Sequence, residues 1–165
     1  MSIALWREGD RAEATRVALA LVGRMDRGQR AAVPHAIDGY HGLVDAFFAM
    51  ATDGDALDLT GETARVHRYL QAHSRAFPFS APLADRMAGS REWGAGNRVA
   101  GLRAWRKAAG AAAQLGMWHE AARSHEHVAR FSPDAAEAAR SSAISSAILS
   151  ALRTTGCATG PHGGA

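Results

Sequence analysis

Apolar residues recur every three or four positions along most of this 165-residue chain, a spacing that gathers them on one face of an α-helix. No segment shows the alternation of β-branched residues that predicts a strand. Alanine, the residue with the highest helix propensity, occurs 38 times. The sequence therefore predicts an all-α protein.

Short breaks divide this pattern into about seven helices. They are predicted within residues 10–25, 34–51, 66–77, 80–93, 98–115, 118–131 and 132–153. A shorter segment, Ser2 to Glu8, looks like the last turns of a helix whose beginning is missing, so the chain is expected to start inside a repeat. Residues 1–153 are predicted to form one domain, followed by a disordered Gly-rich tail at 154–165.

Several side chains are predicted to cap these helices, because an oxygen just before a helix can accept a hydrogen bond from a free N–H of its first turn. The expected caps are Asp10, Asp55, Ser80, Asn97 and Ser132. Prolines are expected in first turns, at Pro34, Pro82 and Pro133. A loop is expected around Gly54 and Gly61.

The apolar spacing also predicts which residues face inward. In the helix at 98–115 they are Val99, Leu102, Trp105, Ala109, Ala112 and Ala113. In the last helix they are Ala136, Ile144, Ala147, Ile148, Ala151 and Leu152.

Three of the predicted turns are alike. An apolar helix end is followed by Gly and then by Asp or Asn at Gly9, Gly54 and Gly96, which are 45 and 42 residues apart. Glycine can adopt the left-handed conformation that ends a helix. A fixed period of roughly 20–50 residues is typical of stacked helical hairpins.

The residues after these glycines resemble the tetratricopeptide repeat. In that family the turn Gly is followed five residues later by a small residue, nine later by an aromatic and twelve later by Ala. From Gly96 these positions hold Gly101, Trp105 and Ala108, and from Gly9 they hold Ala14, Ala18 and Leu21. The Gly54 unit has Leu59 at the small position. The resemblance implies antiparallel hairpins stacked as a right-handed superhelix, in which the small residue permits close packing and the aromatic fills the adjacent groove.

The segment GLRAWRKAAGAAAQLGMWHEAARSH, which begins at Gly101, resembles the helical-repeat tail of large bacterial signalling regulators. Those proteins carry a class III nucleotide cyclase domain or a STAND-type ATPase domain upstream. Their enzymatic motifs are absent from this sequence, which has no glycine-rich phosphate loop and no paired cyclase aspartates. The resemblance therefore implies a module without the activity, whose partner is a protein or peptide, with an upstream ATPase or cyclase domain as one candidate.

No catalytic residue, metal site or cofactor is predicted. Histidines pair at a spacing of six residues, as in His119 and His125, which does not place two ligands on one helix face. The His119–Glu120 pair lacks the second histidine of a zinc protease, and Asp53–Asp55 lacks the glutamate that closes a calcium loop. No Gly-x-Ser-x-Gly nucleophile elbow occurs.

Charge and composition narrow the choice of partner. The net charge of +3 comes from 18 Arg and one Lys scattered among 16 acids, and this argues against nucleic acid, which needs basic residues on one face. Cys157 is the only cysteine, so no intrachain disulfide forms. The chain has no apolar run of about 18 residues and no secretory signal. We therefore expect a cytoplasmic protein without a membrane partner.

Two tryptophans are predicted to belong to an interaction surface. Trp6 lies on the short first helix, where the missing hairpin would leave an apolar face open for self-association or for an upstream domain. Trp118 begins a helix after a Gly turn and is expected to be half exposed. The predicted function is a protein-interaction or regulatory scaffold, and the alternative is a compact helical bundle that binds a small molecule in its core.

Overall fold

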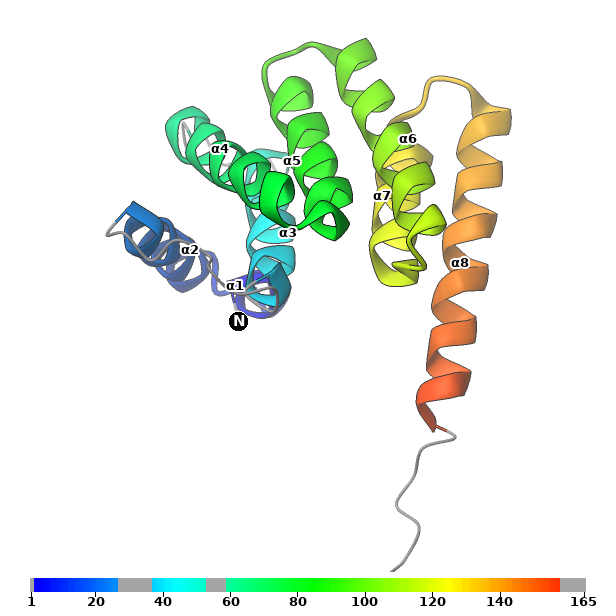
Figure 1. The fold of residues 1–165 in the computed structure, drawn as a ribbon, viewed down its shortest axis with the longest axis horizontal. Coiled ribbons are helices and arrows are strands. Elements are labelled where there is room, and N and C mark those ends of the chain that lie inside the picture. The colour runs from blue at the N-terminus through cyan, green and yellow to red at the C-terminus, as the bar shows by residue number, and fades with distance from the viewer. Residues whose placement is uncertain (1, 27–36, 53–58, 158–165) are drawn as a thin grey trace, which may run out of the picture.

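The computed structural model describes residues 2–26, 37–52 and 59–157, and these are almost entirely helical (Figure 1). Its helices are α1 (Ser2–Arg7), α2 (Arg11–Asp26), α3 (Ile37–Thr52), α4 (Thr60–Ala76), α5 (Ala81–Gly94), α6 (Arg98–Gln114), α7 (Trp118–Phe131) and α8 (Ala135–Cys157). One turn of 3₁₀ helix, Pro78–Ser80, leads into α5. The described residues contain no strand, and the prediction of an all-α protein is confirmed.

Neighbouring helices make most of the contacts. The helices α5 to α8 stand side by side with alternating direction (Figure 1). Among the described residues, each pair of helices in extensive contact is separated by at most two places in the helix order. Stacked hairpins produce such an order. One departure is that α4 packs on α5 and α2 and makes no extensive contact with α3.

Among the described residues, the buried apolar side chains form two hydrophobic cores. The larger one joins α1 to α5 and contains Trp6, Ala14, Ala18, Val22, Leu43, Val44, Ala46, Phe47, Met50, Leu59, Val66, Leu70, Leu83, Ala84 and Met87. The smaller one joins α3 to α6 and α7 through Phe48, Leu102, Trp105 and Val128, with Trp93 and Phe131 packed against it.

Left-handed glycines separate three of the helix pairs. Gly9, Gly96 and Gly116 have φ angles of +90°, +85° and +68° at the ends of α1, α5 and α6, a conformation that glycine adopts without steric cost. Asp10 caps α2 as predicted, since its Oδ1 accepts a hydrogen bond from the Glu13 N–H at 3.1 Å. The predicted turn at Gly54 and the cap at Asp55 lie outside the described residues, as does Pro34.

Three predicted caps are wrong. The Ser80 hydroxyl donates to the Phe77 carbonyl instead, because the 3₁₀ turn continues directly into α5. Asn97 gives its side-chain N–H to Glu92 rather than capping α6. At α8 the cap is Asp134, whose Oδ1 accepts from the Ala136 N–H at 2.9 Å, so the predicted cap Ser132 lies two residues too early.

The outer helices differ from the prediction in which residues they bury. Val99, in the first turn of α6, is 71 % exposed instead of buried. In α8 the residues turned toward α7 are Ser141 and Ser145, while Ile144 is 44 % exposed. Ala136, Ala147 and Ala151 are exposed as well, and Ile148 and Leu152 are only partly buried. An end helix packs on a single neighbour, so most of its surface stays in contact with water.

Two boundaries also change. Gly61 belongs to the first turn of α4 rather than to a loop. Residues 154–157, predicted as part of a disordered tail, continue α8, and 158–165 lie outside the described residues. No helix within the described ranges combines the length and apolar character that a bilayer span requires.

Candidate functional site

The close contact between α5 and α6 depends on two glycines and one tryptophan. A Cβ on Gly101 would lie 3.1 Å from the Gly89 carbonyl oxygen, so a larger residue would separate the helices. Trp105 is fully buried, lies over Gly89 and donates its indole N–H to the Arg86 carbonyl at 3.2 Å. Ala108 continues the same buried face of α6. Gly101, Trp105 and Ala108, the positions that the repeat spacing counts from Gly96, thus lie on the face of α6 that is buried in the structure.

The remaining residues that the sequence assigns to repeat packing or to an interaction surface are Ala14, Trp6 and Trp118, and they differ in how deeply they are buried. Ala14 is fully buried between α2 and the larger core. Trp6 is only 7 % exposed and packs in that core, with the Arg11 guanidinium 5.0 Å from its ring centroid. The expectation that Trp6 presents an open apolar surface is therefore wrong, because α2 and α3 cover it. Trp118 is 50 % exposed.

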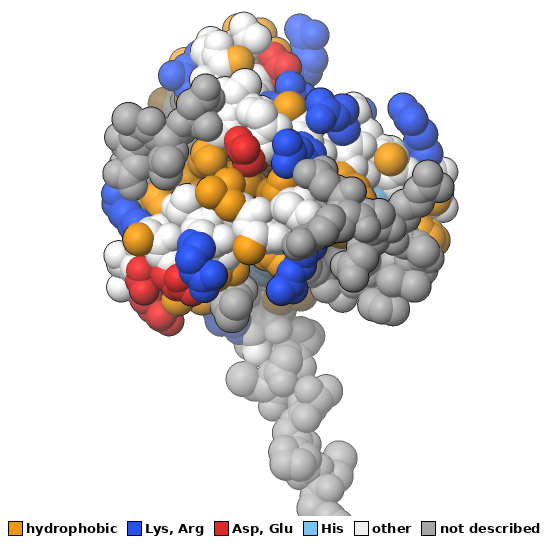
Figure 2. Space-filling model, turned by 90° about the vertical axis from the view of Figure 1, so that its left-hand side faces the viewer, with side chains coloured by type: hydrophobic (Ala, Val, Ile, Leu, Met, Phe, Trp, Pro, Cys, Tyr) orange, Lys and Arg blue, Asp and Glu red, His pale blue; other side chains and the backbone are white. Residues whose placement is uncertain are grey.

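Hydrophobic side chains nevertheless reach the surface near the N-terminal helices. They are grouped in the middle of the face formed by the α1–α4 end of the molecule, between arginines and acidic residues (Figure 2). On α2, Leu19 is 39 % exposed.

A fully buried arginine connects three helices between the two cores. Arg86 of α5 exposes none of its side chain, and it donates from Nε to Glu120 of α7 and from Nη1 to Asp45 of α3. Its Nη2 has no hydrogen-bond partner among the described residues. Buried charges are stable only when they are paired, so these two carboxylates determine where α3, α5 and α7 meet.

The environment of this cluster fixes its charge state. Burial opposes ionisation of Asp45 and Glu120, but the Arg86 guanidinium outweighs it and holds the pKa of both carboxyls below the ordinary value. Burial also lowers the pKa of Arg86, and the two carboxylates reverse that effect and raise it. At neutral pH the cluster is therefore fully charged.

Helices α3 and α7 run parallel to each other through three successive side-chain contacts. His41 Nδ1 lies 2.9 Å from Glu120 Oε2, Asp45 Oδ2 lies 3.6 Å from Arg123 Nε, and the Phe48 ring centroid lies 4.0 Å from that of His127. The partners advance together along both helices, one turn at a time. We call this row of contacts the α3–α7 ladder.

His127, the last residue of the ladder on α7, is uncharged. Its ring is packed between Phe48 and Trp105, whose centroids lie 4.0 Å and 5.1 Å away. Burial, reinforced by the nearby Arg86 charge, lowers its pKa well below the ordinary value. The imidazole is neutral at neutral pH.

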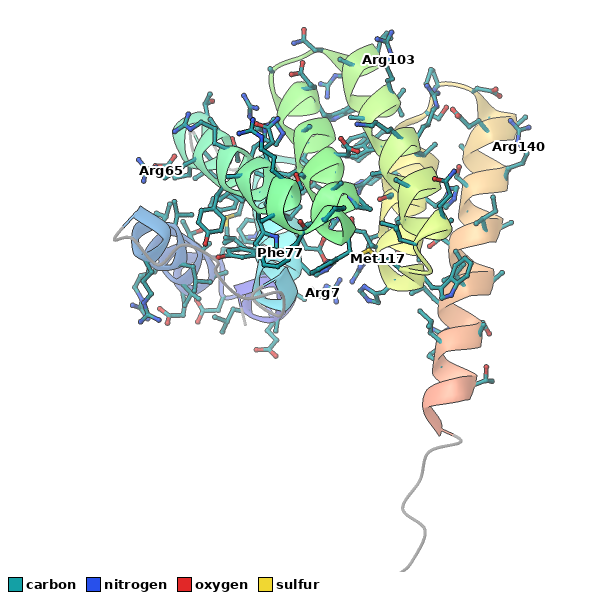
Figure 3. All side chains as sticks on the ribbon, in the orientation of Figure 1. Arg7, Arg65, Phe77, Arg103, Met117 and Arg140 are labelled. Atoms are coloured by element: carbon teal, nitrogen blue, oxygen red, sulfur yellow. The ribbon has the colours of Figure 1, made fainter. Side chains whose placement is uncertain are left out.

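Two cavities lie beside the ladder. One, the Trp118 pocket, has a volume of about 400 Å³ and is lined by His41, Met117, Trp118, His119 and Glu120. The other, the arginine pocket, has a volume of about 330 Å³ and lies between α1, α3 and α7; it is lined by Ile3, Trp6, Arg7, Asp45, Phe48, Ala49, Arg123, Glu126, His127 and Arg130. Arg7 and Met117, one from each pocket, lie at the same lower edge of the molecule (Figure 3).

The side chains described by the structure include no group of three or more His, Cys, Asp or Glu arranged to hold a metal ion. The ionic cluster around Arg86 is held together by charge pairing in a buried environment. The sequence carried one signal for it that was missed. Arg86 follows Leu83 by three residues and precedes Ser90 by four, so it falls on the inward face of the predicted helix. An arginine at such a position needs a buried carboxylate.

Comparisons of this chain with protein-family models, with curated proteins and with solved structures found no match. The similarity to the repeat tails of bacterial regulators therefore stays a prediction, and the candidate site depends on its geometry alone.

Proposed function

We propose that this chain is a non-catalytic, cytoplasmic interaction module built from stacked helical hairpins of the tetratricopeptide type, and that a protein or peptide partner binds at the arginine pocket. The observation that carries the proposal is the convergence of α1, α3 and α7 on one cavity of about 330 Å³. These helices lie at separate places in the helix order, and the fold brings them together at one cavity. Surfaces built from several repeats are the usual binding sites of such arrays.

The composition of the pocket supports a peptide ligand. Its floor is apolar, with Ile3, Phe48 and Ala49, and its rim carries charged side chains such as Arg7 and Glu126. Such a combination binds an extended segment by enclosing an apolar side chain while polar contacts fix its orientation. The volume is at the lower end of the range of roughly 300–1,000 Å³ for ligand cavities, which suits one or two side chains.

The rigidity of the pocket wall also supports the proposal. The α3–α7 ladder and the buried Arg86 hold two of the three helices at a fixed separation. A preformed site loses less entropy on binding than a flexible one. A partner would bind here without prior rearrangement of the wall.

The test is a selection of random peptides displayed on phage, carried out on the intact chain. Ala49 lines the arginine pocket, and Ala49→Phe should fill its floor. We expect selected peptides to bind the unaltered chain and to lose at least tenfold in affinity for the filled variant, which corresponds to about 1.4 kcal/mol.

Ala143→Phe is the matched control, because Ala143 is an exposed alanine of α8, a helix that contributes no residue to the lining of the arginine pocket. Peptides that bind the Ala143→Phe and Ala49→Phe variants equally well would place the binding site elsewhere and contradict the proposal.

A further inference from the structure

The arginine pocket contains more positive than negative side chains. Arg7, Arg123 and Arg130 line it, against the carboxylates of Asp45 and Glu126. The three arginines come from two helices that are far apart in the sequence, α1 and α7. Their meeting at one cavity is therefore a product of the fold rather than of a basic run in the sequence.

The acidic side chains of the pocket are already engaged. Asp45 is ion-paired with Arg86 and lies 3.6 Å from Arg123. Glu126 accepts a hydrogen bond from Arg123 Nη1 at 2.8 Å. These contacts hold the Arg123 guanidinium in place, with 22 % of its side chain exposed. Arg123 is thus a fixed donor at the wall of the cavity.

Arg7 and Arg130 supply the exposed part of the positive charge. Both side chains are exposed, and both border the cavity. The Arg130 guanidinium lies 5.0 Å from the centroid of the Phe131 ring. Guanidinium groups bind carboxylates through two parallel hydrogen bonds.

The chemistry of the pocket favours carboxylate side chains over phosphates. The engaged carboxylates of Asp45 and Glu126 cancel part of the positive charge, and the small excess that remains matches a singly charged group. A phosphate dianion would carry more negative charge than this excess neutralises, next to those two carboxylates. The apolar floor next to the arginines also suits the methylene groups of a glutamate or an adjacent apolar residue. Nucleic acids require a longer row of cations along one face.

We infer that the partner of the arginine pocket presents an acidic segment, in which glutamate or aspartate carboxylates bind Arg7, Arg123 and Arg130 while a neighbouring apolar side chain enters the cavity. This inference rests on the proposed docking function and names the chemistry of the partner. The ionic cluster around Arg86 has a positioning role, because it holds Asp45 and, through it, Arg123.

The experiment measures fluorescence polarisation with three labelled, end-blocked peptides that alternate leucine with Glu, with Gln or with Lys. We expect the Glu peptide to bind at least tenfold more tightly than the Gln peptide, and the Lys peptide to bind least. Affinity for the Glu peptide should fall as salt is raised, because the contacts are ionic and partly exposed.

Substitutions locate the binding. Arg7→Gln and Arg130→Gln should each weaken Glu-peptide binding about tenfold, because each removes a charge-assisted hydrogen bond. Arg103→Gln makes the same change in charge on an exposed residue of α6 at the opposite edge of the molecule (Figure 3), and it should leave the affinity unchanged. Circular dichroism of each variant checks that the fold is retained.

The outcomes separate this inference from the docking proposal. If Glu and Gln peptides bind equally and both are lost with Ala49→Phe, the pocket is a docking site but the acidic partner is wrong. If Ala49→Phe leaves Glu-peptide binding unchanged, both ideas fail at this pocket. Tighter binding of a single-stranded oligonucleotide than of the Glu peptide, lost with Arg7→Gln, would assign the pocket to nucleic acid and overturn the inference.

Discussion

Arg86 of α5 and Glu120 of α7 form a hydrogen-bonded ion pair in which neither side chain exposes more than 1 % of its surface. Removing one member of a buried pair leaves the other charged without compensation. We therefore expect Arg86→Met to lower the free energy of unfolding by roughly 3–5 kcal/mol, measured by urea denaturation.

The control is the exposed pair between Arg106 and Glu137, joined at 2.6 Å with 47 % of the arginine side chain exposed. Arg106→Met should cost at most about 1 kcal/mol, because solvent screens the pair. Equal losses for the buried and the exposed pair would show that Arg86 does not hold the three helices together.

The contact of Gly89 with Trp105 gives a second prediction. A Cβ at Gly89 would lie 2.5 Å from the Trp105 indole nitrogen, and that ring is fully buried. Gly89→Ala should therefore destabilise the protein by about 1–3 kcal/mol despite the better helix propensity of alanine. Gly110→Ala, in α6 with nothing within 4 Å, should instead stabilise it by about 0.5–1 kcal/mol. Thermal melts that move in the same direction for both variants would contradict the packing described here.

Acid should destabilise the protein before its carboxylates titrate. The pKa of His127 is lowered by burial, whereas in the unfolded chain this histidine binds a proton below about pH 6.5. The unfolded state then binds more protons than the native state, so stability falls as the pH drops below that value, by up to about 1.4 kcal/mol per pH unit.

His127→Leu should remove part of this dependence between pH 6.5 and 5, where Asp45 and Glu120 stay ionised. The remainder comes from His67, His119 and His125, whose pKa values burial also lowers. Urea denaturation at several pH values measures the slope. An unchanged slope in the variant would mean that His127 is protonated in the native state.

Nucleotide turnover is expected to be absent. The sequence contains no phosphate-binding loop and no paired metal-binding aspartates, which nucleotide hydrolysis and cyclisation require. Purified protein incubated with ATP or GTP and magnesium should release no product above a buffer blank. Turnover that copurifies with the protein through several columns would refute the non-catalytic proposal.

Self-association is expected at the α1–α4 end. Hydrophobic side chains are grouped on that face (Figure 2), and apolar patches on a surface favour association. Leu19 is 39 % exposed on α2, so Leu19→Glu should shift sedimentation toward the monomer without unfolding the chain. Ile144→Glu, at a 44 % exposed site on α8, is the matched control and should leave the distribution unchanged. A wild-type chain that sediments as a monomer at high concentration would contradict this prediction.

The helices could be predicted because they depend on local patterns. Apolar spacing determines where a helix forms, and left-handed glycines such as Gly9 and Gly96 determine where it ends. Both effects depend only on residues that are close together in the sequence. Gly101 and Trp105 lie at the α5–α6 contact where the repeat spacing places them. Gly89, which approaches Trp105 even more closely, escaped notice because its role appears only once α5 lies against α6.

The candidate site depends on pairings that the sequence does not display. Asp45, Arg86 and Glu120 are separated by 41 and 34 residues, and nothing in the spacing selects these three among the other charged residues. The exposure of Ile144 and the burial of Ser141 also depend on how two helices pack together, which the sequence of α8 alone does not display. The face of α8 that packs on α7 carries Ser141 and Ser145, so the apolar spacing of α8 does not identify its covered face.

The α3–α7 ladder has a consequence for the way the molecule unfolds. In an ordinary array of hairpins each unit touches only its neighbours, and such arrays can open progressively from either end. Here the ladder connects His41 to Glu120 and Phe48 to His127 across 79 residues of chain. Helices α3 to α7 should therefore lose their structure in a single concerted step, with their amides exchanging at one common rate. Helix α8, which packs on α7 through Ser141 and Ser145, lies outside this unit and should exchange before it.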